Sequence, residues 1–158
     1  MFNHAPADYD CPFCRTDLTR GSRPVEILHR YERVTVRLNP KCWPNNPGGA
    51  LVVPHDHYEN LYDLPPHLGT PLQKAVRDTA LAMKAAFSCD GVSTRQHNEP
   101  AGNQDVWHYH VHVFPRYWND HLYEMRGDWV DADRMREYAD AIRAAWPIQS
   151  SNDAATDG

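Results

Sequence analysis

Residues 108–116 read His-Tyr-His-Val-His-Val-Phe-Pro-Arg, and this run constrains the fold more than any other part of the chain. Successive side chains of a strand point to opposite faces, so the imidazoles of His108, His110 and His112 share one face. The residues between them are apolar and are expected to pack on the core against the main helix: Tyr109, Val111 and Val113. The chain must therefore bury one face of this strand and place three polar rings on the other.

The rest of the sequence predicts a mixed α+β fold with a mostly antiparallel sheet. β-branched and apolar runs bounded by turn residues predict strands over 25–29, 34–38, 50–53, 91–97 and 108–114. Residues 38–49 and 99–105 are expected to be loops, and 58–64 a single helical turn. Helical spacing predicts the main helix over 66–87 and a second helix marked by Met135, Tyr138, Ile142 and Trp146, with Asp131 or Asp133 as its N-cap.

Length and charge limit the kind of molecule. A chain of 158 residues is expected to form one domain, here residues 1–148, followed by a small, polar, disordered tail over 149–158. The net charge of −5 argues against a nucleic-acid partner. The chain lacks an apolar run of about 20 residues, so no membrane span is expected. The first ten residues do not resemble a signal peptide, and a cytoplasmic location is expected.

Three interpretations of the alternating histidines compete. They could be inert and exposed, although strict alternation of three is rarely accidental. They could bind zinc together, but Cα atoms about 6.6 Å apart on a straight strand space three ligands too widely for one ion. They could also act in nucleophilic catalysis, because a neutral imidazole nitrogen can attack phosphorus and its neighbours can fix its tautomer.

Cys11-Pro-Phe-Cys14 is a second candidate site. Alone, a C-x-x-C pair could be redox-active or consist of two unrelated thiols. No second pair follows, so an all-cysteine zinc site would need Cys42 and Cys89, whereas histidines can complete a four-coordinate site. In a reducing compartment the four cysteines are expected to be free thiols or metal ligands rather than disulfides.

The run at 108–116 resembles the His-φ-His-φ-His-φ-φ signature of the histidine triad family, where φ is apolar. HNEPAGNQDVW at 97–107 is similar to the loop before the triad, and GGALVVPHDH at 48–57 to the strand ending in Pro-x-x-His. The resemblance covers roughly residues 9–118. It implies a five-stranded antiparallel sheet with one long helix and a C-terminal helix, and a homodimer whose sheets form a ten-stranded surface.

The resemblance also implies an activity and its residues. Members hydrolyse or transfer a nucleoside monophosphate, here of a purine (AMP-type) nucleotide, through a covalent nucleotidyl-histidine, without a catalytic metal. His110 corresponds to the nucleophile, and His112 to the residue at the phosphate and the departing group. The remaining contacts implied are phosphate oxygens for Gln104 and Asn98, ribose hydroxyls for Asn39, and the base for Leu38 and Trp43.

In metal-bearing branches of the family the ligands resemble the C-x-x-C pair, the histidine of Pro-x-x-His and the first triad histidine. The corresponding residues are Cys11, Cys14, His57 and His108. A structural zinc ion there would hold the N-terminal segment on the sheet. His108 would then face the metal while the middle histidine remains free to react.

The sequence departs from the family at two positions. Asp105 stands where a Ser or Thr is common, and an ionised carboxylate can only accept hydrogen bonds, so it would repel a polyphosphate leaving group. Either Asp105 turns away from the leaving group, or that group carries a donor such as an amine. His97 occupies the usual place of the loop amide, with Asn98 one residue later. Two rival functions follow: a nucleotide-binding regulatory module with little turnover, and a hydrolase that uses zinc-bound water.

Overall fold

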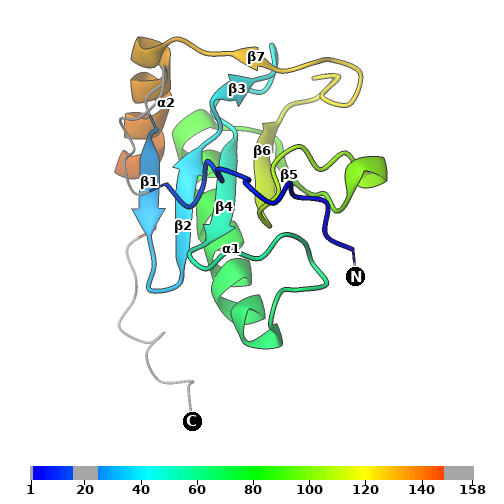
Figure 1. Ribbon diagram of the computed structural model, residues 1–158. Helices are drawn as coiled ribbons and strands as arrows, with labels where there is room; N and C mark the ends of the chain where they lie inside the picture. Colours follow the sequence, from blue (N-terminus) through cyan, green and yellow to red (C-terminus); the bar gives the residue numbers. More distant parts are fainter. Residues whose placement is uncertain (1, 16–24, 148–158) are drawn as a thin grey trace.

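The computed structural model describes residues 2–15 and 25–147. Five strands form one sheet in the order β1-β2-β4-β6-β5, with every neighbouring pair antiparallel (Figure 1). Their bounds are β1 Ile27–Arg30, β2 Val34–Leu38, β4 Ala50–Pro54, β5 Gly91–Gln96 and β6 Val111–Arg116. The predicted α+β class with a five-stranded antiparallel sheet is confirmed. The predicted tail over 149–158 lies outside the described residues.

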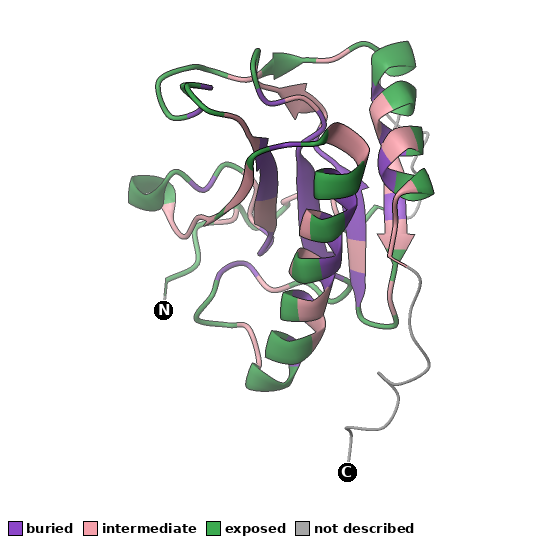
Figure 2. Cartoon of the chain, turned by 180° about the vertical axis from the view of Figure 1, so that it is seen from behind, coloured by how far each residue is buried: buried purple, intermediate pink, exposed green. Residues whose placement is uncertain are grey.

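Both long helices cover the same face of this sheet (Figure 2). The 3-10 helix η1 (Pro66–Leu68) leads into α1 (Gly69–Phe87), which ends where Ser88 adopts a left-handed conformation and its N–H bonds the Lys84 carbonyl. α2 (Ala132–Ala144) begins at Asp131, whose side chain accepts from the Arg134 N–H at 2.9 Å. Asp131 is therefore the N-cap of the predicted second helix.

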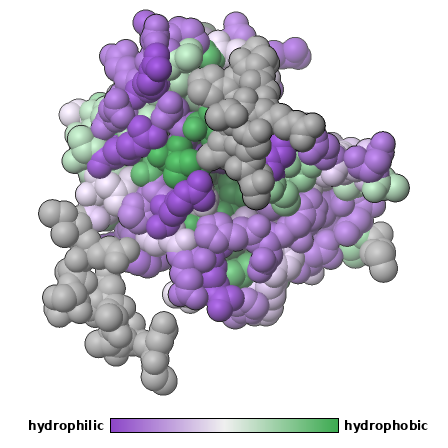
Figure 3. Space-filling view, turned by 60° about the vertical axis from the view of Figure 1, so that its left-hand side comes forward, coloured by the Kyte–Doolittle hydropathy of each residue, from purple (hydrophilic) through white to green (hydrophobic). Residues whose placement is uncertain are grey.

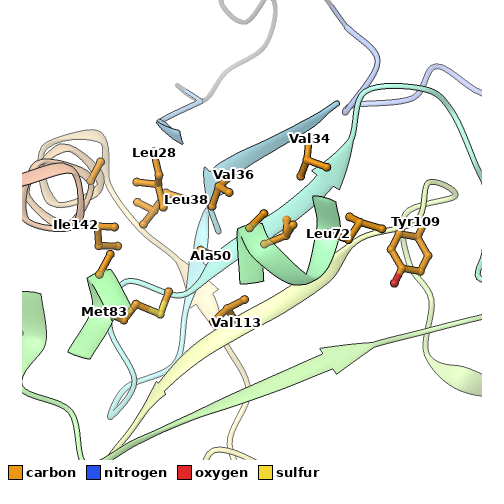
Figure 4. Packing of buried hydrophobic residues seen from close by; sticks show 14 of the residues in the cluster. Leu28, Val34, Val36, Leu38, Ala50, Leu72, Met83, Tyr109, Val113 and Ile142 are labelled. Carbon is orange, nitrogen blue, oxygen red and sulfur yellow. The ribbon is translucent and has the colours of Figure 1, made fainter. Parts of the chain in front are cut away.

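The core lies between the sheet and these helices because the strands alternate as predicted. Val34, Val36 and Leu38 of β2 point towards the helices, as Val113 of β6 does, and all are buried (Figure 4). Tyr109 also joins this cluster and Val111 packs against its edge. The residues between them on the same strands face the opposite side, which leaves that side of the sheet free for polar side chains.

Two predicted elements differ from the structure. The strand expected at 108–114 is β6 at 111–116, and it continues through Pro115, which pairs with Val92. This is possible because β4 pairs with β6 only as far as Val113, so Pro115 has a neighbour strand on one side and its missing N–H costs little. The helical turn expected at 58–64 is a turn, where Asn60 Oδ1 accepts from the N–H groups of Tyr62 and Asp63.

A second, two-stranded sheet was not predicted. β3 (Lys41–Cys42) pairs with β7 (Asp128–Trp129). The segment after β6, residues 117–129, therefore returns beside the loop after β2 and is called the returning segment. Gly127 lies directly against Trp43, where an added Cβ would be 2.9 Å from the indole ring. This close approach requires a glycine, and it fixes the returning segment against the sheet.

The returning segment is also held by a buried carboxylate. Asp120 is 3% exposed and accepts hydrogen bonds from Arg116 at 2.6 and 2.8 Å, from Asn46 at 2.6 Å and from the N–H groups of Tyr117 and Leu122. The Arg116 guanidinium and these amides hold the pKa of Asp120 well below its usual range, although burial opposes them. Both carboxylate oxygens are thus surrounded by donors.

None of the helices in the described ranges is long and apolar enough to cross a membrane. The face in Figure 3 is largely hydrophilic, and its hydrophobic atoms gather in small recessed areas.

We predict that Asp120→Asn lowers the free energy of unfolding by about 3 kcal/mol, because an amide N–H₂ would face donors and leave Arg116 without its charge partner. Urea denaturation at pH 7 measures the change. The matched change Asp63→Asn, at an exposed turn residue, is expected to cost less than about 0.5 kcal/mol. Equal costs for the two variants would contradict the role given to Asp120.

Candidate active site

The candidate site lies on the sheet face opposite the helices, where the N-terminal segment crosses the strands (Figure 1). His112 of β6 is paired across the sheet with Leu51 of β4 and Arg95 of β5, so these three side chains share that face. The rings of Phe13, from the N-terminal segment, and His110 are 5.2 Å apart. Residues from four distant parts of the chain therefore meet around the predicted triad.

His108 faces the two cysteines of the N-terminal segment. Its Nε2 lies 3.1 Å from the Pro54 carbonyl oxygen, and a carbonyl can only accept, so Nε2 carries the proton. The lone pair is then on Nδ1, which lies 3.3 Å from Cys11 Sγ and 3.4 Å from Cys14 Sγ. Cys14 Sγ also lies 3.2 Å from Nδ1 of His57.

These four side chains form a compact Cys₂His₂ cluster. One possible ligand atom from each residue lies within 4.8 Å of the other three. Burial, then the hydrogen bond and charge of Cys11, raise the pKa of Cys14 to about 11, so two adjacent thiolates need a cation beside them. Two sulfurs and two imidazole nitrogens are a donor set that zinc binds tetrahedrally, and the Pro54 carbonyl supplies the outer hydrogen bond typical of a ligating histidine.

His110 has the opposite tautomer. Its Nδ1 lies 2.8 Å from the carbonyl oxygen of His108, so Nδ1 donates and Nε2 holds the lone pair when the ring is neutral. The side chain is 4% exposed, and burial lowers the pKa of His110, although its hydrogen bond to His108 opposes the shift. The ring is therefore neutral near pH 7 and presents an unprotonated nitrogen.

His112 completes the arrangement. Its Nε2 lies 3.2 Å from Nε2 of His110, and since the latter accepts, Nε2 of His112 carries the proton. Nδ1 of His112 is buried and has no hydrogen-bond partner in the described part of the chain, as suits a nitrogen without a proton. Burial, aided by the charges of His110, His97 and Arg95, lowers the pKa of His112 to about 3. Each ring thus carries one proton, and the proton on Nε2 of His112 lies between the two Nε2 atoms.

A cavity of about 640 Å³ opens beside these two histidines. Its size is within the usual range of about 300–1,000 Å³ for small-molecule sites. Besides His110 and His112 it is lined by residues of the N-terminal segment, the sheet and the returning segment: Pro12, Phe13, Asn39, Pro40, Lys41, Trp43, Leu51, Arg95, His97, Asn103, Asp105, Val106, Phe114, Leu122, Tyr123, Met125, Arg126, Gly127 and Trp129.

The predicted nucleotide contacts divide into two groups. Asn39 and Trp43 line the cavity, whereas Leu38 points into the core because it follows the alternation of β2. Gln104 and Asn98 do not line it. Gln104 donates to the carbonyls of Glu59 at 2.6 Å and Val106 at 3.1 Å.

Asn98 accepts from the Leu61 N–H at 2.8 Å, so in this structure both predicted amides hold loops together. The two departures from the family pattern do line the cavity. Asp105 is exposed there, and His97 donates from Nδ1 to the Gly102 carbonyl, with its ring 5.9 Å from that of His112. Both residues that depart from the family pattern therefore lie in the same cavity as His110 and His112.

Sequence reasoning missed the far wall of the cavity. Arg95 could have been found, because it alternates with His97 on the strand predicted at 91–97. The residues of the returning segment carry no motif that would have indicated them: Leu122, Tyr123, Met125, Arg126, Gly127 and Trp129.

Comparison with known proteins agrees with this geometry. A family model described as the HIT domain matches residues 21–119, which is more than half of the chain. The chain belongs to the histidine triad (HIT) family. A solved structure of a zinc-bound histidine triad protein from Mycobacterium smegmatis is 29% identical to this HIT protein, with a TM-score of 0.70, over 86% of this chain and 92% of that one.

Two curated relatives are named as enzymes. The adenylylsulfatase HINT3 of Arabidopsis thaliana is 28% identical over 72% of this HIT chain and 56% of its own length. The adenosine 5′-monophosphoramidase HNT1 of Saccharomyces cerevisiae is 28% identical over 71% of this chain and 67% of its own length. The HIT family to which this chain belongs therefore includes nucleotide hydrolases.

We predict that His112→Asn flattens the pH dependence of stability in mild acid. The ordinary pKa of histidine is about 6.5, whereas that of His112 in the folded protein is about 3. Between these pH values the unfolded chain binds a proton at residue 112 that the folded chain does not bind, which favours unfolding. Wild-type stability should fall from pH 6.5 towards 3, and the variant should lose about 1 kcal/mol per pH unit of that slope. Urea denaturation between pH 4.5 and 5.5 measures it; an unchanged slope would mean that His112 is charged in the fold.

Proposed function

We propose that this protein is a nucleotide hydrolase or transferase that cleaves a purine nucleoside monophosphate from its leaving group through a nucleotidyl-His110 intermediate. The observation that carries the proposal is the hydrogen bond from Nδ1 of His110 to the His108 carbonyl. It leaves the Nε2 lone pair of a neutral, buried ring beside a cavity of suitable size.

The proposed reaction has two displacements. Nε2 of His110 attacks the α-phosphorus, the bond from phosphorus to the leaving group breaks, and its electron pair stays with that group. The Nε2–H of His112 is placed to donate to the departing atom or to a phosphate oxygen. Water, or another acceptor in a transfer, then attacks phosphorus, and the N–P electron pair returns to His110. The proton of the attacking group passes to Nε2 of His112, replacing one given to the leaving group, or to solvent.

Other residues of the cavity suit the nucleotide. Phe13, beside His110, and Leu51 offer apolar surface for a base, so we propose them for the base in place of Leu38 and Trp43. Asn39 lies where a ribose hydroxyl can reach its side chain. We propose that Gln104 and Asn98 act by fixing the loop before the triad, and that the side chain of His97 meets the phosphate. The loop contacts of both amides, and the position of His97 in the cavity, support this division.

We predict that His110→Ala lowers turnover of adenylylated substrates by about 10⁴-fold or more, because the attacking atom is gone. Rapid acid-free quenching of wild type with a radiolabelled nucleotide should trap label on His110. His67→Ala removes an exposed histidine far from the site and should keep wild-type turnover. Full activity in His110→Ala would disprove the covalent mechanism.

We also propose that the Cys₂His₂ cluster binds a structural zinc ion, held by Cys11, Cys14, His57 and His108. The ion would join the N-terminal segment to the end of β4 and fix the backbone at 108, whose carbonyl orients the nucleophile. Zinc here would supply no reacting atom, since His110 and His112 do not belong to the cluster.

We predict one zinc ion per chain in the purified protein by metal analysis, and near-complete loss of zinc in Cys14→Ala with a fall in unfolding free energy of several kcal/mol. Cys42→Ala, a thiol outside the cluster, should keep its zinc. Metal-free protein of full stability would disprove the proposal. Loss of turnover on mild chelation, with the fold intact, would instead favour the rival zinc-water hydrolase.

Asp105 supports a second candidate, a nucleotide-binding regulatory module with little turnover. Its exposed carboxylate lies in the cavity where a hydroxyl donor is common in the family. Tight AMP binding without hydrolysis of any adenylylated compound would decide for this alternative. A cytoplasmic homodimer remains part of the proposal: β5 is an edge strand, and an unpaired edge suits pairing with a second copy.

A further inference from the structure

The cavity continues past His112 into a part that the proposed nucleotide contacts do not use. A row of ring contacts gives the order along it: His110 to His112 at 4.8 Å, His112 to Phe114 at 5.6 Å, and Phe114 to Trp43 at 5.0 Å. Phe13 lies at the other end, beside His110. A nucleoside on the Phe13 side therefore leaves the Trp43 side for the leaving group.

Arg95 lies among the aromatic rings of that far part. Its guanidinium carbon lies 4.8 Å from the centre of the Phe114 ring, 4.7 Å from that of Tyr123 and 5.8 Å from that of Trp43. Aromatic rings stabilise a guanidinium by cation–π contact. Burial lowers the pKa of Arg95, and the Tyr123 side chain, through its charge and a hydrogen bond, opposes that shift. The Arg95 side chain is thus held in position without a carboxylate on it.

Two donors of Arg95 have no partner. Its Nε and Nη2 are buried and make no hydrogen bond within residues 2–15 and 25–147. A buried charged donor without an acceptor is costly, and a planar guanidinium fork matches two oxygens of a phosphate or sulfate. Such an arrangement is explained by a ligand that brings the oxygens.

The surrounding charges favour an anion as well. Lys41 and Arg126 line the same cavity as Arg95, and Lys41 lies over the Trp129 ring at 5.1 Å. The cavity has one carboxylate in its lining, that of Asp105, which is exposed and screened by solvent. The positive charges of Arg95, Lys41 and Arg126 therefore outweigh the negative charge of Asp105, which was the reason to expect an amine leaving group.

We infer that Arg95 is a specificity-determining residue that binds an oxyanionic leaving group, a sulfate or a phosphate chain, on the far side of His112. The inference rests on the proposed nucleotidyl transfer to His110. As the P–O bond to the leaving group breaks, the electron pair stays on that oxygen, and Arg95 meets the negative charge directly. A phosphoramidate releases an amine, which gains nothing from a guanidinium. One relative described above is named an adenylylsulfatase and the other a phosphoramidase, so the relatives do not distinguish the two kinds of leaving group. The distinction for this protein rests on Arg95.

The test compares Arg95→Met and Arg95→Lys with wild type on three substrates: adenosine 5′-phosphosulfate, diadenosine tetraphosphate and adenosine 5′-phosphoramidate. The readout is kcat/KM for each oxyanion substrate divided by that for the phosphoramidate. Met keeps the apolar stem among the rings, and Lys keeps the charge without the fork. Arg33→Met removes an exposed arginine outside the cavity and is the matched control.

We expect the ratio to fall by about 10- to 100-fold in Arg95→Met, less in Arg95→Lys, and not at all in Arg33→Met. A fall for one oxyanion substrate alone identifies whether sulfate or phosphate is bound. An unchanged ratio, or equal losses on all three substrates, would overturn the inference, because a residue that only supports the wall affects every leaving group alike.

A binding measurement separates this inference from the proposed function. Calorimetric titration of tripolyphosphate into wild type should show binding that weakens at least about 10-fold in Arg95→Met, with thermal melts to confirm that both are folded. If wild type turns over none of the substrates, the proposed function fails, and the titration still decides: equal affinity in the two proteins overturns the role of Arg95.

Discussion

Two backbone carbonyls determine what the triad can do. The Pro54 carbonyl accepts a hydrogen bond from His108 and so keeps the proton of that ring on Nε2. The His108 carbonyl accepts one from His110 and keeps the proton of that ring on Nδ1. Neighbouring imidazoles would otherwise exchange tautomers freely, because the two neutral forms differ little in energy. With these acceptors in place, His108 turns a lone pair to the cysteines, His110 turns one to the cavity, and His112 donates from Nε2 to His110.

His108 therefore belongs to two systems at once. Its side chain is part of the Cys₂His₂ cluster, while its carbonyl orients the neighbouring ring two residues later. None of the four cluster residues lines the cavity, so an ion bound by the cluster would act on the cavity through the His108 backbone. Burying three imidazoles within and just before β6 costs less because the rings are neutral, as the lowered pKa values of His108, His110 and His112 indicate.

The sequence predicted the parts of the site that depend on local periodicity. Alternation over 108–113 separated the imidazoles from Val111 and Val113, and the resemblance to the HIT family brought together the Cys₂His₂ cluster. The position of β6 was less accurate, because its neighbours β4 and β5, which are distant in sequence, decide where pairing begins and ends. The cavity wall formed by the returning segment could not be predicted. It depends on the contact of Gly127 with Trp43 and on the hydrogen bonds that Asp120 accepts, one of them from the distant Asn46. Neither contact produces a periodic pattern in the sequence.

The alternation of β6 has one more consequence. Val113 and His112 are successive residues, one buried under the helices and the other in the cavity, so a shift of the strand by a single residue would exchange them. It would bury an imidazole in the core and present a valine to the cavity at the same time. A chain misaligned at β6 would therefore lose its core packing and the imidazole in its cavity together.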